Sequence, residues 1–323
     1  MVGKYNEPIL ILGTGALACL FAARLAAAGN RVRMLGTWPE GLAALANLGV
    51  TLANEDGSLR SYPVKVSADP NDFSGVRHVL VLVKSWQTAR AADQLFKCLA
   101  VDGVALTLQN GLGNREKLVE KLGTERVAFG ITTGGATLLG PGQVRAGGEG
   151  KITVAKQARI TPIVDWLSAA GFQVEVVESV DSLAWGKLVV NAAINPLTAL
   201  LEVANGELLK RPPARELSAE LANEVVSVAS GKNIPLPFDD AVKAVENVIE
   251  RTADNRSSML QDVGRGSLTE IDAINGAVVE AGREIGIPTP ANEVMWKLVN
   301  ALSPVHSVIA SGARQSSRNR EGE

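Results

Sequence analysis

A glycine-containing turn between an apolar strand and an apolar helix near the N-terminus restricts the folds open to this chain more than any other segment. Residues 8–12 (PILIL) have the length and composition of a buried strand, and they run directly into Gly13-Thr14-Gly15-Ala16-Leu17-Ala18. A helical pattern follows and ends at Gly29. In a Rossmann-type fold the first glycine allows the tight turn, the second lets a pyrophosphate approach the backbone, and the helix N-terminus supplies N–H donors. The third position is an alanine, an allowed variant. We therefore expect residues 13–18 to bind a dinucleotide.

The end of the second expected strand bears on which dinucleotide fits. Residues 31–35 form this strand, and Gly36-Thr37-Trp38 follows. An NAD site usually places an acidic residue here to accept a hydrogen bond from the ribose 2′-OH. The first acid is Glu40, which comes too late, so no carboxylate repels a 2′-phosphate and the pattern favours NADP(H). No arginine stands at the strand end, so Thr37 and backbone amides would hold the phosphate, and NAD(H) stays an alternative.

Further strand patterns continue an α/β domain. They occur at residues 62–66, 79–83, 104–108 and 127–131, and two more, at 151–155 and 172–177, flank a helical pattern at 162–170. The glycine-rich segment 134–150 is expected to form a hairpin or a loop. Lys84 and Asn110 each follow a strand closely, and ligands bind at the carboxyl ends of parallel strands. A turn or helix-cap role is the alternative. It stays open for Lys84, whereas for Asn110 we favour a functional role.

Strand patterns stop near Asp181, and helical periodicity takes over. Helices are expected at about 181–203, 213–230, 239–252, 267–285 and 292–302. The sequence therefore predicts a Rossmann-type domain over residues 1–178 and an all-α domain over 179–310. The remaining segment, 311–323, is polar and is expected to be disordered.

The first helix of that second half, residues 181–201, carries three polar residues on an apolar background. Lys187, Asn191 and Asn195 recur every four residues, which places them on one stripe of the helix. A buried ammonium and two buried amides cost several kcal/mol unless something pairs with them. The alternative is a lysine whose stem packs while its head reaches water. Pro196 has no N–H to donate to the carbonyl of Ala192, so we expect a kink and freed backbone groups there.

Three further polar residues of the second half are candidates for the site. Ser257 and Ser258 precede Met259-Leu-Gln-Asp, which fits a helix start, and either serine fits its N-cap. Glu270 opens the helix expected at 267–285. Considered alone, it fits best as an acidic residue in a first helical turn, where the helix dipole favours negative charge.

Composition limits the partners. The chain has 323 residues, 46% of them hydrophobic and 20% charged, with a net charge of −2. This is enough chain for two domains with cores, and it predicts no nucleic-acid or membrane-surface partner. Cys19 and Cys98 lack CxxC spacing, so we expect reduced thiols in a cytoplasmic protein. With only His78 and His306 as histidines, a histidine-based metal site or triad is not expected.

Together these motifs resemble the ketopantoate reductase (2-dehydropantoate 2-reductase) family over nearly the whole chain. The matching segments are GTGALA at 13–18, QNG at 109–111, GKLVVNAAINPLTAL at 186–200, NGEL at 205–208 and SSMLQD…TEID within 257–272. The resemblance implies a Rossmann domain and a helical domain of the type found at the C-terminus of 6-phosphogluconate dehydrogenase, meeting at the active site. It also implies NADPH-dependent reduction of 2-dehydropantoate to (R)-pantoate, on the route to pantothenate and coenzyme A, with a homodimer as one arrangement.

The resemblance assigns roles to individual residues. It makes Lys187 the catalytic lysine, which protonates the substrate oxygen as hydride reaches the keto carbon, and Glu270 the glutamate that contacts the reacting oxygen. The implied substrate contacts are Asn191, Asn195, Asn205 and Ser258. The implied cofactor contacts, besides residues 13–18, are Lys84, Asn110 and Ala136. The family often has an arginine at the end of the second strand, which binds the 2′-phosphate of NADP. That position is Thr37 here, so this departure bears on the choice between NADP and NAD.

Two other functions fit the same architecture. One is a reductase or dehydrogenase of another small 2-keto or 3-hydroxy acid. The other is a dinucleotide-binding sensor without turnover, against which Lys187, Asn191 and Glu270 argue, because a sensor needs no proton donor.

Overall fold

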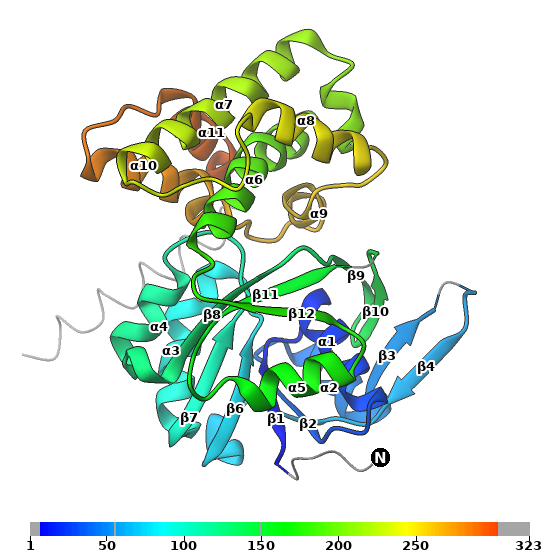
Figure 1. Cartoon of the computed structure of the whole chain (residues 1–323). Coiled ribbons are helices and arrows are strands. Elements are labelled where there is room, and N and C mark those ends of the chain that lie inside the picture. The colour runs from blue at the N-terminus through cyan, green and yellow to red at the C-terminus, as the bar shows by residue number, and fades with distance from the viewer. Residues whose placement is uncertain (1–6, 55, 149, 303–323) are drawn as a thin grey trace, which may run out of the picture. The chain divides into compact units, whose positions relative to one another are not determined.

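The structure is a computed structural model that describes residues 7–54, 56–148 and 150–302. Contacts divide the chain into two compact units, residues 1–181 and 182–323, which we call unit 1 and unit 2 (Figure 1). The domain limits expected at residues 178 and 310 stay a proposal, and the tail expected to be disordered, 311–323, lies outside the described residues.

Unit 1 is built on an eight-stranded sheet. Its strands, in spatial order, are β12 (Gln173–Val177), β11 (Lys151–Ala155), β8 (Val127–Thr132), β7 (Leu99–Thr107), β6 (Val76–Val81), β1 (Ile9–Leu12), β2 (Val32–Leu35) and β5 (Lys65–Ser67). The six strands from β8 to β5 are parallel, and β11 joins β8 antiparallel. The strand β2 lies beside β1 on one side, followed by β5, and β6 lies beside β1 on the other side, followed by β7 and β8. The strand order therefore reverses between β1 and β6, which is where ligands bind in such sheets.

Helices cover both faces of this sheet. On one face α1 (Ala16–Ala27) and α5 (Thr161–Ala169) pack in a core that includes Ile9 and Ile11. On the other, α3 (Thr88–Cys98) and α4 (Asn114–Leu122) pack in a core that includes Leu10 and Leu12. Because β1 is buried on both faces, its sequence is an unbroken apolar run rather than an alternating one. A further helix, α2 (Pro39–Leu48), follows β2.

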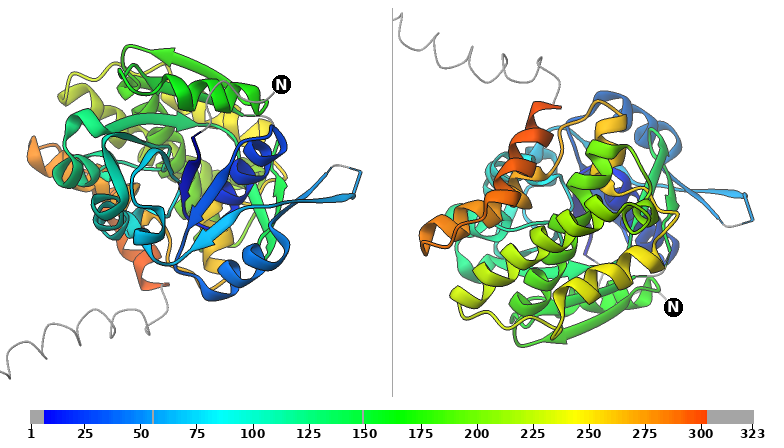
Figure 2. Two further views of the ribbon diagram at one scale, coloured as in Figure 1. Left: turned by 90° about the horizontal axis from the view of Figure 1, so that it is seen from below. Right: turned by 90° about the horizontal axis from the view of Figure 1, so that it is seen from above.

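A second, four-stranded sheet packs against α1. Its order is β4 (Leu59–Tyr62), β3 (Val50–Ala53), β10 (Gln143–Ala146) and β9 (Ala136–Gly140). The β3–β4 hairpin extends outward from unit 1 (Figure 2). The antiparallel β9–β10 pair confirms the hairpin alternative for 134–150. The single strand expected at 62–66 is wrong: the segment is divided at Pro63, whose ring removes a ladder donor, and its halves join different sheets.

Unit 2 is helical. Its helices are α6 (Asp181–Leu201), α7 (Pro212–Gly231), α8 (Ala241–Arg251), α9 (Ser258–Gly264), α10 (Asn275–Glu284) and α11 (Pro290–Ala301), with 3₁₀ turns η4 (Asn205–Leu208) and η5 (Ile271–Ala273). The expected helix 267–285 begins too early. Glu270 precedes η5, and Ile274, at φ −103° and ψ −92°, interrupts helical geometry before α10 starts. No helix in the described residues is long and apolar enough to cross a membrane.

Candidate active site

The polar stripe of α6 lies on a helix that is otherwise mostly buried. Lys187 and Asn191 are partly buried, and Asn195 is buried at 8% exposure. Their neighbours Val189 and Ala192 have no accessible surface. Three polar groups therefore share one face of an apolar helix, separated by about one turn each.

Lys187 is electrostatically coupled to Glu270. Burial lowers the pKa of Lys187 to about 8, and the negative charge of Glu270 opposes that shift. The Glu270 side chain comes from the segment before η5 and is 5% exposed. Part of the Lys187 side chain is accessible, and its pKa nevertheless lies below that of a lysine in water. Its role as the catalytic lysine stays a prediction.

The two serines have different roles. Ser257 is the N-cap of α9: its Oγ accepts a hydrogen bond from the Leu260 N–H at 3.1 Å and lies 2.7 Å from Thr198 Oγ1 of α6. Ser258 is exposed at the first position of the helix. The N-cap alternative therefore applies to Ser257, and the hydroxyl of Ser258 is not needed for capping.

Asn205 begins η4 and is buried at 7% exposure. Its Nδ2 donates to Thr252 Oγ1 at 2.9 Å, and its backbone N–H donates to the Asn255 carbonyl at 3.0 Å. Within the described residues, its Oδ1 has no hydrogen-bond partner. A buried amide oxygen without a donor is costly, and a ligand hydroxyl would satisfy it.

One residue of unit 2 was not identified from the sequence. Asn275 is fully buried, and its Nδ2 donates to the carbonyl of Ala192 at 3.1 Å, the group that Pro196 cannot bond. The freed backbone group expected near Pro196 thus has a side-chain donor. The only local signal in the sequence was an asparagine five residues after Glu270, in a segment that also holds Ile271, Ala273 and Ile274.

The glycine turn of unit 1 lies at the β1–β6 switch point. Gly13 has φ +121°, and a Cβ there would lie 3.0 Å from the Leu82 carbonyl oxygen. A Cβ at Gly15 would meet nothing within 4 Å, although Gly15 is the N-cap of α1 and has no side-chain cap. Open space in front of free helix N–H groups suits a phosphate. Thr14 and Ala18 are buried, whereas Thr37 is exposed directly after β2.

The carboxyl ends of β6 and β7 are joined by buried amides. Gln109 Nε2 donates to the Val83 carbonyl at 2.9 Å and to Thr88 Oγ1 at 2.8 Å. Asn114 accepts from Thr88 Oγ1 at 2.8 Å and donates to the Asn110 carbonyl at 2.9 Å. The backbone of Asn110 is therefore held at the ligand edge of the sheet, and its side chain is partly buried.

The other expected cofactor contacts lie in different settings. Lys84 is the N-cap residue of a 3₁₀ turn, η2 (Ser85–Gln87), and its backbone N–H donates to Gln87 Oε1 at 3.3 Å. The role expected for its side chain in cofactor binding stays a prediction. Ala136 starts β9, four residues after β8 ends, and pairs with Ala146.

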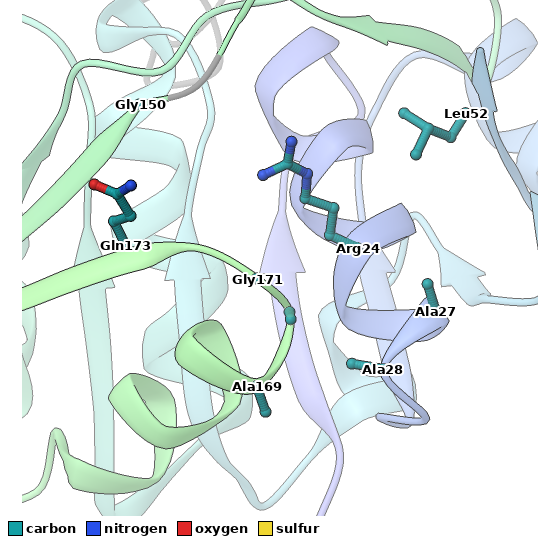
Figure 3. Close-up of a pocket in the computed structure, with 9 residues that line it drawn as sticks. Arg24, Ala27, Ala28, Leu52, Gly150, Ala169, Gly171 and Gln173 are labelled. Atoms are coloured by element: carbon teal, nitrogen blue, oxygen red, sulfur yellow. The ribbon is translucent and has the colours of Figure 1, made fainter. Parts of the chain in front are cut away.

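A cavity in unit 1 lies away from these groups. It has a volume of about 450 Å³ and surrounds the C-terminal end of α1, with Arg24 and Gly171 in its wall (Figure 3). None of the expected site residues lines it. Both cysteines are buried, and burial raises the pKa of Cys19 to about 12 and that of Cys98 to about 11, so neither thiol is prepared for nucleophilic attack.

Comparison with known proteins places both units. The family model of ketopantoate reductase PanE/ApbA matches residues 9–159, and the model of its C-terminal domain matches residues 179–303. The 2-dehydropantoate 2-reductase of Halobacterium salinarum is 35% identical over 297 residues, which is 90% of this chain and 97% of that protein. The enzyme of the same name from Archaeoglobus fulgidus is 35% identical over 303 residues, 92% of this chain and 98% of its own.

Solved structures agree with the sequence matches. The PanE/ApbA family ketopantoate reductase of Ralstonia eutropha has a TM-score of 0.86 and 31% identity, covering 92% of this chain and 98% of that one. A D-mandelate dehydrogenase in complex with NADH and anilino(oxo)acetate also has a TM-score of 0.86, with 27% identity over the same shares. This chain therefore belongs to the ketopantoate reductase family, whose members pair an N-terminal α/β domain with a helical C-terminal domain and act as pyridine-nucleotide-dependent oxidoreductases on small molecules.

Proposed function

We propose that this protein reduces 2-dehydropantoate to (R)-pantoate with NADPH, a step of pantothenate and coenzyme A biosynthesis in the cytoplasm. The Lys187–Glu270 pair is the observation that carries the proposal. A partly buried lysine with a pKa of about 8 is still largely protonated at neutral pH and gives up its proton more readily than a lysine in water, as a general acid must.

Each of the site residues of unit 2 has a different role toward the keto acid. A bound nicotinamide supplies the hydride. Lys187 directs its ammonium at the keto oxygen, stabilises the developing negative charge and donates a proton to it. Glu270 keeps that lysine charged against the effect of burial. Asn191 and Asn195 orient the substrate from the same stripe.

Two further groups suit the rest of the molecule. The unsatisfied Oδ1 of Asn205 would accept a hydrogen bond from the substrate hydroxyl, and the exposed hydroxyl of Ser258 would donate to the carboxylate. Such polar contacts give a keto acid with a hydroxyl group an advantage over one without it.

In unit 1, residues 13–18 would hold the pyrophosphate, since the position of a Gly15 Cβ is open and the α1 N-terminus has no side-chain cap. Thr37 would contact the 2′-phosphate. The absence of an acid in segment 36–38 supports NADPH. Asp72 argues against NADPH. Its carboxylate accepts a hydrogen bond from Ser67, and Ser67 pairs with Leu35 at the end of β2, so a negative charge lies near the end of that strand. The cofactor preference is therefore best measured with both nucleotides.

The test is oxidation of NADPH or NADH by purified protein with 2-dehydropantoate. We expect turnover that is faster with NADPH. Lys187→Ala should lower kcat roughly 100-fold or more while the affinity for the nucleotide stays the same. Turnover that survives this change nearly intact would remove Lys187 from the mechanism.

The likeness to a D-mandelate dehydrogenase favours a second candidate, reduction of an aromatic 2-keto acid. A panel containing phenylglyoxylate beside 2-dehydropantoate separates the two by kcat/KM. If no keto acid accelerates nucleotide oxidation, the sensor alternative takes the place of both. Sedimentation of the same preparation tests the homodimer.

A further inference from the structure

Pro196 creates a backbone defect in the helix that carries Lys187. A helical residue at position 196 would donate its N–H to the carbonyl of Ala192, and proline cannot. Ala192 is fully buried, so water cannot make up the missing bond. The Nδ2 of Asn275, 83 residues later in the chain, donates to that carbonyl at 3.1 Å. The defect is thus a specific attachment point for a second segment.

The attachment lies close to both members of the Lys187–Glu270 pair. Ala192 is five residues beyond Lys187 on α6, and Asn275 is five residues beyond Glu270. The intervening turn is closed by two hydrogen bonds, because the N–H groups of Ala273 and Ile274 both donate to the Glu270 carbonyl at 3.1 Å. One side-chain hydrogen bond therefore links the backbone segment that carries Glu270 to the helix that carries Lys187.

The amide of Asn275 is itself fixed in orientation. Its second Nδ2 hydrogen reaches Asn292 Oδ1 at 2.9 Å. Asn292 in turn donates to the Leu221 carbonyl at 3.2 Å and to Glu224 at 2.7 Å, and Glu224 also accepts the backbone N–H groups of residues 291 and 292. Asn292, which is itself held by Glu224 of α7, thus fixes one hydrogen of the Asn275 amide, and rotation of that amide away from α6 would break both hydrogen bonds of its Nδ2.

We propose that Asn275 is a positioning residue that fixes the distance between Lys187 and Glu270 by holding the carbonyl that Pro196 leaves without a donor. Its effect on turnover rests on the proposed function, whereas its effect on the proton affinity of Lys187 does not. If Asn275 only satisfied a buried carbonyl, any other donor to Ala192 would replace it.

Four proteins distinguish a positioning role of Asn275 from a role that only supplies a donor to the Ala192 carbonyl. They are wild type, Asn275→Ala, Pro196→Ala and the double variant. Pro196→Ala supplies an N–H within α6, and because a carbonyl accepts two hydrogen bonds, it keeps the Asn275 contact and should retain kcat. Asn275→Ala should lose stability and up to about 100-fold in kcat. In the double variant the carbonyl is bonded again, so Tm should return toward that of wild type while kcat stays low. Recovery of kcat together with Tm would overturn the proposal.

A second measurement needs no turnover. The reactivity of Lys187 with acetic anhydride, followed across pH by peptide mass spectrometry, reports its pKa in each protein. If Asn275 keeps Glu270 near Lys187, the double variant loses the charge that opposes burial, and the Lys187 pKa falls below that of wild type. An unchanged or raised value contradicts the positioning role. This result stands even if the wild-type protein does not reduce 2-dehydropantoate.

Discussion

At the scale of single residues, the site depends on Lys187, whose pKa is set by two opposed influences. Burial removes water from the ammonium and disfavours its charge, while the Glu270 carboxylate restores part of that loss. A lysine in water would remain a weak acid at neutral pH. Here the same group can both attract a developing alkoxide and release a proton to it.

The pKa of Lys187 sets a pH dependence for reduction. The proton donor is present below a pH of about 8 and is lost above it, so kcat/KM should be level near pH 7 and fall by about tenfold per unit at high pH. A profile of kcat/KM for the keto acid against pH checks this. Because Glu270 raises the pKa, Glu270→Gln should move the alkaline limb to lower pH. A limb that stays in place or moves up would show that Glu270 does not tune the lysine.

The two adjacent serines provide a matched pair of substitutions. Ser257→Ala removes the N-cap of α9 and the contact with Thr198, and should lower the free energy of unfolding by about 1 to 2 kcal/mol. Ser258→Ala removes an exposed hydroxyl and should raise KM for the keto acid with little change in stability. Urea unfolding and steady-state kinetics on both variants check the two roles, and an equal KM effect from both would contradict them.

At the scale of elements, the two glycines of the turn before α1 have different roles, Gly13 in folding and Gly15 in binding. Gly13 is required by its backbone, since its φ of +121° is strained for other residues and a Cβ would approach the Leu82 carbonyl oxygen. Gly15 has no such constraint in the protein itself, because the space in front of it is open.

Substituting each glycine separates these roles. Gly13→Ala should lower the free energy of unfolding by about 1 to 3 kcal/mol. Gly15→Ala should leave unfolding unchanged and weaken the binding of NADPH, because the new methyl group occupies the space of the pyrophosphate. Thermal unfolding with and without NADPH measures both. Unimpaired nucleotide binding in Gly15→Ala would place the phosphates elsewhere.

The elements also show where sequence patterns succeed and fail. The central strands of unit 1 are buried on both faces, so their apolar runs stand out in the sequence. The small sheet was missed in part because β4 is mostly exposed and carries no apolar alternation. The helix start at 267 was wrong because Ile271, Ile274 and Val278 have helical spacing, although the backbone of Ile274 is not helical. Asn275 was missed because its partner, Ala192, is 83 residues away, and no local pattern encodes that contact.

At the scale of the whole molecule, each unit contains its own chemistry. The glycine turn and the Gln109–Asn114 bridge lie in unit 1, and the Lys187–Glu270 pair with Asn275 lies in unit 2. Both hydrophobic cores of unit 1 consist of residues before position 181. The motifs at 13–18 and 186–200 could be recognised in the sequence because each is local to one unit.

A fragment of residues 1–181 is therefore expected to fold and bind NADPH with an affinity close to that of the full chain. Circular dichroism and fluorescence titration of the fragment check this. It should show no turnover, since the proton donor lies beyond its end. A fragment that unfolds, or that binds only when unit 2 is supplied, would mean that nucleotide binding is shared between the units.

The small sheet over α1 has a consequence for biosynthesis of the chain. Most of α1 is buried, and β10 contributes to its cover through Val144 in the same core as Phe21. On the ribosome, a nascent chain that has emerged only as far as β8 holds α1 and β3 but lacks both β10 and Phe172, whose ring stacks on that of Phe21 with centroids 4.4 Å apart. The apolar cover of α1 is therefore complete only after residue 172 has left the exit tunnel, and until then part of that surface is open to chaperones and to other nascent chains.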